Sequence, residues 1–129
     1  MDKNQFDLFM NYDNNYNLLV TIHYFKKQQT YDDFFIFIYH KINSLLDLKK
    51  KELNSSTLEV FIDLKDYKRK ELDYSVIKLL IKNLSEKYPD NLKAIYLKNG
   101  SFVLKSIYAI ICPFIDKVTR KKIKFIKNI

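Results

Sequence analysis

The sequence predicts an α/β fold in which helices pack on one small, mixed β-sheet. Stretches rich in β-branched and aromatic residues, typical of strands, alternate along the chain with stretches whose apolar residues recur at helical spacing. The order strand, helix, strand repeats through most of the chain, as in layered α/β proteins. With 129 residues, the chain has the length of a single domain, expected to span residues 1–129.

The first half of the chain contains one expected strand and one expected helix. The strand is expected over residues 17–25, NLLVTIHYF. An irregular arm is expected over residues 1–17, which are rich in Asn and Asp, and the core of the domain is expected over residues 18–126. A helix is expected over residues 31–50, beginning at a capping box formed by Thr30 and Asp33. The run FFIFIY within it also suits a buried strand, and the longer apolar period favours the helix.

The second half repeats the alternation, with prolines at two helix ends. Pro89 and Pro113 each stop a helical pattern, and Asn99-Gly100 predicts a turn. Ile77, Leu80, Ile81 and Leu84 form the apolar stripe of the first of these helices. The expected elements are a strand over 57–64, a helix over 73–88, a strand over 92–98, a helix over 101–112 and a last strand over 122–126.

The charge of the chain predicts an acidic partner. The net charge is +8, and all 23 basic residues except Arg69 and Arg120 are lysines. Lysine is a mobile point charge suited to general attraction, to nucleic acid or to an anionic membrane surface. The single cysteine, Cys112, allows no internal disulfide, and the longest apolar stretch, residues 107–115, falls short of the ~20 residues of a membrane span. We therefore expect a cytoplasmic protein that is soluble or peripheral to membranes.

Three motifs in the second half of the chain resemble the CRAL-TRIO lipid-binding domain, the fold of phosphatidylinositol transfer proteins. They are VFIDLKDY (60–67), SEKYPDNLKAIYLKNGSF (85–102) and CPFIDKVTRKKIKFI (112–126), and they occur in the family's order at compatible spacing. The resemblance covers residues 58–126 well and residues 18–50 by element order only. Too little chain precedes the first strand for the family's helical N-terminal lobe, so the sequence resembles a shortened member.

The resemblance implies an apolar cavity closed by a mobile helix. In this sequence the gate segment, residues 101–112, takes that place, between Asn99-Gly100 and Pro113. A carrier must offer acyl chains as dry an environment as the bilayer does, and this segment has little polar surface. Its periodicity alone also suits an ordinary core helix. The residues expected at the gate and acyl chains are Phe102, Val103, Ile107, Ile110, Ile111 and Phe114.

The resemblance also implies a site for the lipid head group. Thr119 and Lys122 match the family's phosphate ligands, and Asp90 matches the acid that contacts an inositol ring. A hydroxyl and an ammonium on adjacent turns can both donate to one phosphate, although each residue alone also suits an ordinary cap, turn or surface position. Arg120, Lys121 and Lys124 could hold further phosphates of a phosphoinositide or face an anionic membrane.

The strand before Asp63 favours inositol lipids over choline lipids. Members that bind phosphatidylcholine carry hydroxyl residues there, whereas this chain has Leu58 and Val60 at the matching positions. The expected function is therefore binding, and transfer or presentation, of phosphatidylinositol or a phosphoinositide. The lipid is the expected ligand, with no other cofactor and no metal. A second copy of the chain in a homodimer would help to cover the acyl chains.

Two other classes of function compete with this reading. A basic nucleic-acid-binding module without a lipid cavity fits the charge, but no recognition motif is visible and the aromatic residues fall in expected core elements. An enzyme is not expected, because His23 and His40 stand alone, Cys112 adjoins a proline on an apolar helix, and the single glycine leaves no phosphate-binding loop.

Overall fold

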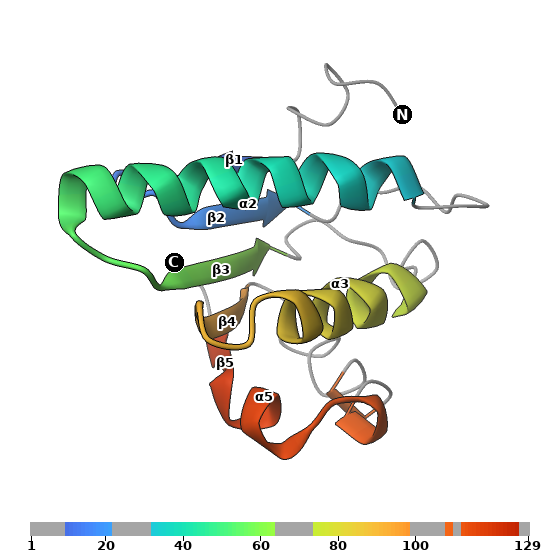
Figure 1. Cartoon of the computed structure of the whole chain (residues 1–129). Coiled ribbons are helices and arrows are strands. Elements are labelled where there is room, and N and C mark those ends of the chain that lie inside the picture. The colour runs from blue at the N-terminus through green and yellow to red at the C-terminus, as the bar shows by residue number, and fades with distance from the viewer. Residues whose placement is uncertain (1–9, 22–31, 64–73, 99–107, 110–111, 127–129) are drawn as a thin grey trace.

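A computed structural model describes residues 10–21, 32–63, 74–98, 108–109 and 112–126 of the chain (Figure 1). Strands and helices alternate along these residues, as the sequence predicts. The elements are β1 (Met10–Tyr12), β2 (Leu18–Thr21), α2 (Asp32–Leu53), β3 (Leu58–Asp63), α3 (Tyr74–Lys87), β4 (Leu92–Lys98), the 3₁₀ turn η3 (Cys112–Phe114), α5 (Lys117–Lys122) and β5 (Ile123–Ile126).

The strands form one mixed sheet in the order β1-β2-β3-β4-β5. β1 pairs antiparallel with β2, and the remaining neighbouring pairs are parallel. The expected mixed sheet is therefore confirmed. The expectation of an irregular arm was wrong for Met10–Tyr12, because pairing with β2 gives this short segment a ladder that its polar sequence does not signal.

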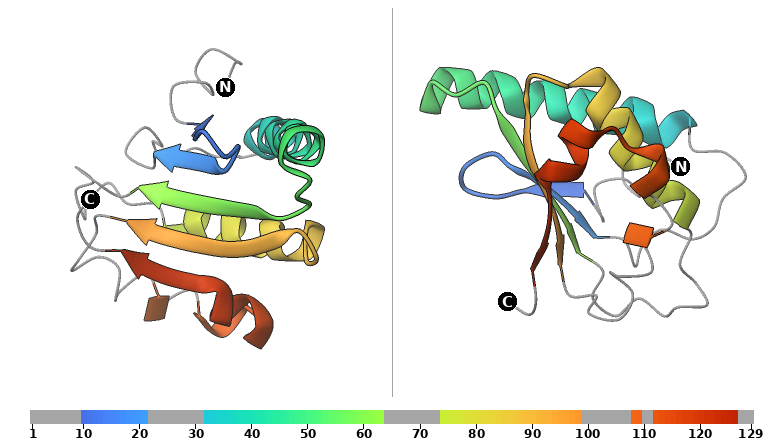
Figure 2. Two further views of the ribbon diagram at one scale, coloured as in Figure 1. Left: turned by 90° about the vertical axis from the view of Figure 1, so that its left-hand side faces the viewer. Right: turned by 90° about the horizontal axis from the view of Figure 1, so that it is seen from below.

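The long helices α2 and α3 lie on the same face of the sheet (Figure 2). Each joins two neighbouring parallel strands, and right-handed crossovers that advance in one direction place successive helices on one face. The expected stripe of α3 is buried, as is the inner side of α2, which ends at Leu53 rather than near residue 50. The core side chains that join the layers include Leu18, Ile38, Ile42, Val60, Ile62, Ile77, Leu80, Ile81, Leu84 and Ile95.

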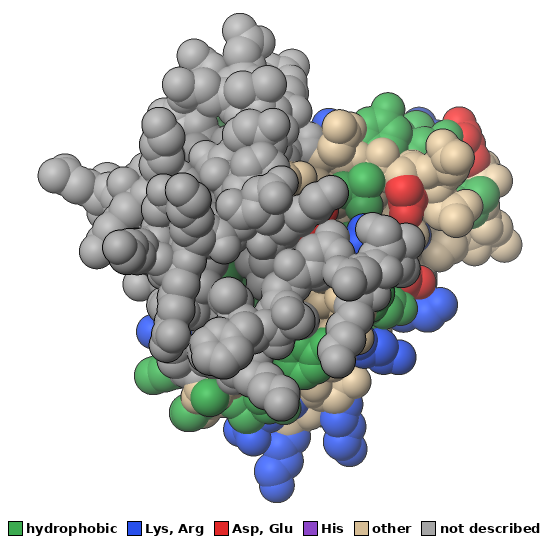
Figure 3. Space-filling model, turned by 180° about the vertical axis from the view of Figure 1, so that it is seen from behind, with side chains coloured by type: hydrophobic (Ala, Val, Ile, Leu, Met, Phe, Trp, Pro, Cys, Tyr) green, Lys and Arg blue, Asp and Glu red, His purple; other side chains and the backbone are tan. Residues whose placement is uncertain are grey.

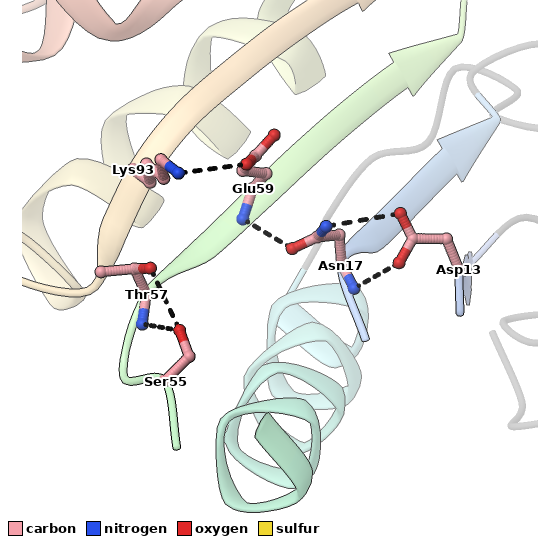
Figure 4. A network of polar contacts seen from close by, with 6 residues as sticks. All are labelled: Asp13, Asn17, Ser55, Thr57, Glu59 and Lys93. Atoms are coloured by element: carbon pink, nitrogen blue, oxygen red, sulfur yellow. Dashed lines mark hydrogen bonds and ion pairs between the residues drawn. The ribbon is translucent and has the colours of Figure 1, made fainter. Parts of the chain in front are cut away.

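A polar network fixes the β1–β2 turn to the beginning of β3 (Figure 4). The buried side chain of Asn17 accepts a hydrogen bond from the backbone N–H of Glu59 at 3.2 Å. Asp13 accepts the backbone N–H of Asn17 at 2.9 Å and its amide Nδ2 at 3.4 Å. Lys93 of β4 lies 3.7 Å from the Glu59 carboxylate, so the network extends from the turn through β3 to β4.

A short helix, which the sequence pattern did not predict, lies between η3 and β5. α5 occupies Lys117–Lys122, so Lys122 is its last residue and β5 begins at Ile123. Tyr108 and Ala109 are helical, and Cys112 begins η3 instead of ending a helix. The rest of the expected helix over 101–112, the Asn99-Gly100 turn and the capping box at Thr30 lie outside the described residues. None of the described helices is long and apolar enough to cross a membrane.

Candidate functional site

The candidate site is built around α5, whose beginning is fixed by Asp116. This aspartate is the N-cap: its carboxylate accepts the backbone N–H of Thr119 at 3.2 Å and the Thr119 hydroxyl at 2.6 Å. Both bonds favour the charged carboxylate and therefore hold the pKa of Asp116 below its ordinary value, and the bond from the Thr119 hydroxyl has the larger effect. A helix of six residues is therefore stable here largely through its cap and its packing.

Thr119 faces inward and is buried with 3% of its surface exposed. Its single hydroxyl hydrogen is donated to Asp116, so a phosphate could receive that hydrogen only in place of the carboxylate. The role of Thr119 as a phosphate ligand stays a prediction. The structure adds a second role, because the same hydroxyl fixes the first turn of the helix that carries Lys122.

Lys122 lies beside the turn that contains Asp90. Its ammonium donates a hydrogen bond of 3.1 Å to the backbone carbonyl of Pro89, across 33 positions of sequence. The contact arises because β4 and β5 are parallel neighbours, so the turn before β4 and the end of α5 meet at the same edge of the sheet. The expected acid and the expected phosphate-binding lysine are thus brought together, both near solvent.

The remaining cations of the expected site are neighbours of Lys122 in the sequence. Arg120 donates through Nε to the carbonyl oxygen of Ile115 at 2.7 Å, which leaves its other guanidinium N–H groups for a ligand. Lys121 and Lys124 are exposed. The segment from Arg120 to Lys124 therefore presents four cations on a short helix end and the first residues of β5.

The two strand positions tied to choline-lipid binding are buried in the core. Leu58 and Val60 have 1% and 0% of their surface exposed and belong to the cluster that joins the sheet to the helices. Aliphatic side chains at these positions offer no hydrogen bond to a head group.

The apolar half of the expected site is described only in part. Phe102, Val103, Ile107, Ile110 and Ile111 lie outside the described residues. Phe114 is exposed, and the ammonium of Lys78 lies 4.2 Å from the centre of its ring. Tyr108 packs edge-on against Phe125 at 5.5 Å, a contact that no spacing in the sequence signals. A hydrogen bond with Cys112 is the main cause that raises the pKa of Tyr108.

Within the described part of the chain, no group of three His, Cys, Asp or Glu side chains could hold a metal ion. His40 lies on the exposed surface of α2. What these residues offer is Lys122 beside the turn of Asp90, with three more cations close by in the sequence. Chemically, an ammonium beside a carboxylate-bearing turn can donate to a phosphate while the carboxylate accepts from hydroxyl groups.

The comparisons with known proteins identify the family. The model of the CRAL/TRIO domain matches residues 3–129, so the chain belongs to the CRAL-TRIO family. It is 28% identical over 72 residues to the CRAL-TRIO domain-containing protein C3H8.02 of Schizosaccharomyces pombe, a match that covers 56% of this chain and 16% of that protein.

A solved structure shows the same fold over almost the whole chain. The crystal structure of Sfh5 matches with a TM-score of 0.73 and 21% identity, covering 97% of this chain and 51% of the Sfh5 chain. The chain thus spans about half the length of this structural relative and less of the fission yeast protein. The fold expected from the sequence is therefore confirmed.

Proposed function

We propose that the chain binds an inositol phospholipid, phosphatidylinositol or a phosphoinositide, and transfers it between membranes or presents it. The acyl chains lie in an apolar space beside the gate segment and Phe114. The head group lies at the edge of the sheet where α5 meets the turn before β4. The 3.1 Å hydrogen bond between Lys122 and the carbonyl oxygen of Pro89 carries the proposal, because it joins Lys122 to the turn of Asp90.

Lys122 supplies most of the phosphate-binding energy in this proposal. Without ligand, its ammonium donates to an uncharged carbonyl oxygen. A phosphate would replace that neutral acceptor by an anion, and charge-assisted hydrogen bonds are roughly twice as strong as neutral ones. The net gain of about 1–2 kcal/mol corresponds to roughly tenfold in affinity.

Asp90 and the apolar strand positions supply the selectivity. Asp90 is exposed and free to accept hydrogen bonds from the hydroxyl groups of an inositol ring. A choline head group offers no such donor, and neither Leu58 nor Val60 can donate a hydrogen bond to its phosphate. Arg120, Lys121 and Lys124 favour additional phosphates on the ring through charge.

The cations around α5 also support a proposal about where the protein acts. A lipid carrier must meet a membrane, and the cations around α5 suit an anionic, cytoplasmic membrane surface. We propose a peripheral, non-enzymatic protein, with the phospholipid as its ligand. A homodimer in which the second copy helps to cover the acyl chains belongs to the same proposal.

Uptake of lipid from vesicles tests the proposal. The parent protein is incubated with vesicles that contain either phosphatidylinositol or phosphatidylcholine as the labelled lipid, and lipid bound to the recovered protein is counted. We expect phosphatidylinositol to be taken up in preference, and Lys122→Ala to reduce that uptake about tenfold. Lys50→Ala, at an exposed position of α2, is the matched control and should behave like the parent.

Two results would contradict the proposal. If Lys122→Ala binds inositol lipid as well as the parent and Lys50→Ala do, the head-group assignment is wrong. If the parent takes up no lipid but binds oligonucleotides with a steep dependence on salt, the chain is a nucleic-acid-binding module instead.

A further inference from the structure

The outer surface of η3 and α5 exposes apolar side chains between lysines. Phe114 has 57% and Val118 has 63% of its surface exposed, and Lys117 and Lys121 are also exposed. We call these four residues the α5 outer surface. Positions 117 and 121 stand four residues apart on α5 and share a helix face, and Phe114 ends η3 two residues before the cap of α5.

The opposite side of the same segment is packed against the domain. Ile115, Thr119 and Ile123 are buried, so the orientation of α5 is fixed by its inner side chains. The exposure of Phe114 and Val118 is therefore a consequence of how α5 packs. It is not a product of a frayed helix end, since Asp116 caps the first turn.

Exposed apolar side chains are concentrated in this part of the molecule. Phe114, Val118 and Phe125 fall within twelve consecutive positions, whereas Tyr12, Ile36 and Leu53 are scattered over the rest of the described chain. Seen from behind, hydrophobic and basic side chains lie together along the lower edge of the molecule, the end at which Figure 1 shows α5 (Figure 3). Exposed apolar side chains that lie together on a surface are typical of interaction sites.

The charge around this surface is positive. Lys78 of α3 places its ammonium 4.2 Å from the centre of the Phe114 ring, so a third lysine borders the surface. The one acid in the segment, Asp116, is engaged by both donors of Thr119. A partner that meets this surface must therefore offer negative charge and must also accept bare aromatic and aliphatic side chains.

We propose that the α5 outer surface docks on an anionic lipid bilayer, with Phe114 and Val118 entering the boundary between head groups and acyl chains. The three lysines then lie at the level of the lipid phosphates. An anionic bilayer offers negative charge and an apolar phase side by side, and that pairing is what this surface complements. A nucleic acid would satisfy the lysines but would leave Val118 without an apolar partner.

This docking rests on the proposed function and extends it. The same short helix carries Lys122 and Thr119 on its other sides, so docking would bring the head-group site to the lipid surface. Lys117 and Val118 are docking residues with no part in the proposed lipid site, and Asp90, Thr119 and Lys122 are head-group residues outside the docking surface. The two roles can therefore be separated by experiment.

Flotation with vesicles that contain no inositol lipid tests the docking alone. The vesicles are either pure phosphatidylcholine or phosphatidylcholine with phosphatidylserine. We expect the parent to bind only the anionic vesicles. Phe114→Ser with Val118→Ser should weaken this binding about tenfold, and Lys117→Gln with Lys121→Gln should weaken it about fivefold for each lysine removed.

Matched controls are available on α2, where Ile36 is 53% exposed and Lys50 is exposed. Ile36→Ser and Lys50→Gln should bind anionic vesicles as the parent does. All variants change exposed side chains, so their thermal transitions should match that of the parent. A soluble, short-chain phosphatidylinositol separates the two roles. The single variant Val118→Ser, at a residue outside the proposed lipid site, should bind this lipid normally, and Lys122→Ala should bind vesicles normally.

Three results would overturn the docking proposal. One is equal binding of anionic vesicles by the parent and the Phe114/Val118 variant. Another is the absence of any vesicle binding by the parent. The third is binding of oligonucleotides through Lys117 and Lys121 with no vesicle binding. Failure of short-chain lipid binding by the parent, with vesicle binding intact, would instead contradict the head-group assignment and leave the docking supported.

Discussion

Replacing Thr119 by valine separates its two roles, as a cap partner and as a phosphate ligand. Valine keeps the shape of threonine and removes the hydroxyl, which donates to Asp116 at 2.6 Å in the free protein. Loss of this hydrogen bond, partly offset by the added apolar group, should lower the free energy of unfolding for Thr119→Val by about 1 kcal/mol. For a chain of 129 residues, the melting temperature should fall by about 3 °C.

The expected effect of the same change on lipid affinity is small. A phosphate that takes the Thr119 hydroxyl replaces a carboxylate, so one anionic acceptor is exchanged for another. The hydroxyl therefore contributes little net binding energy, and the affinity of Thr119→Val for inositol lipid should stay within about threefold of the parent. Lys122 differs, because its acceptor in the free protein is an uncharged carbonyl oxygen.

Thr119→Ser is the matched control for this prediction. It keeps the hydroxyl and removes a buried methyl group, which should cost about 1 kcal/mol of stability. Thermal denaturation and titration with short-chain phosphatidylinositol would be measured for both variants. If Thr119→Val lost more than tenfold in affinity while Thr119→Ser bound like the parent, the hydroxyl would contribute net binding energy. That result would refute the argument that a phosphate merely replaces the Asp116 carboxylate as its acceptor.

Three further predictions concern the polar groups that support the fold. Lys49 is buried on α2, and this burial lowers its pKa, while the charges of Glu59 and Asp13 oppose the shift. The free energy of unfolding should therefore rise with pH as Lys49 loses its charge. Lys49→Met should remove this rise and stabilise the protein by about 1 kcal/mol in denaturant unfolding at neutral pH. Asn17→Ala leaves the N–H of Glu59 without its acceptor and should cost about 2 kcal/mol in the same measurement. The pKa of Asp116 is lowered in the folded protein, so its stabilising effect is present above about pH 3.8 and is lost as the pH falls through the folded pKa. In thermal denaturation, the difference in melting temperature between the parent and Asp116→Asn should therefore become smaller in acid.

Periodicity predicted the parts of the fold in which one face is buried. Strands β3 and β4 and helix α3 were found within one residue of their bounds, because alternation and an apolar stripe reflect packing against a single core. β1 and α5 were missed for physical reasons. Three residues of β1 depend on pairing with β2, and six residues of α5 depend on the Asp116 cap and on packing of Thr119.

The candidate site was predictable as a set of residues but not as a set of contacts. The motifs named Asp90, Thr119 and Lys122, and the structure brings Lys122 to the turn of Asp90. No spacing in the sequence signals that Lys122 rests on a backbone carbonyl or that Asp116 takes the Thr119 hydroxyl, since both contacts depend on how α5 meets the sheet edge. The alternation of apolar and basic residues from Phe114 to Lys121 was visible, but only the packing of α5 shows which of them face outward.

The lipid that accompanies the protein through purification tests the central claim most directly. The protein would be purified from cells without added lipid, and the bound lipids would be extracted and identified by mass spectrometry beside those of Lys122→Ala. We predict phosphatidylinositol or its phosphates, enriched over their share in the cell and depleted in the variant. Choline lipids in their place, or an equal lipid content in both proteins, would contradict the assignment of the head-group site.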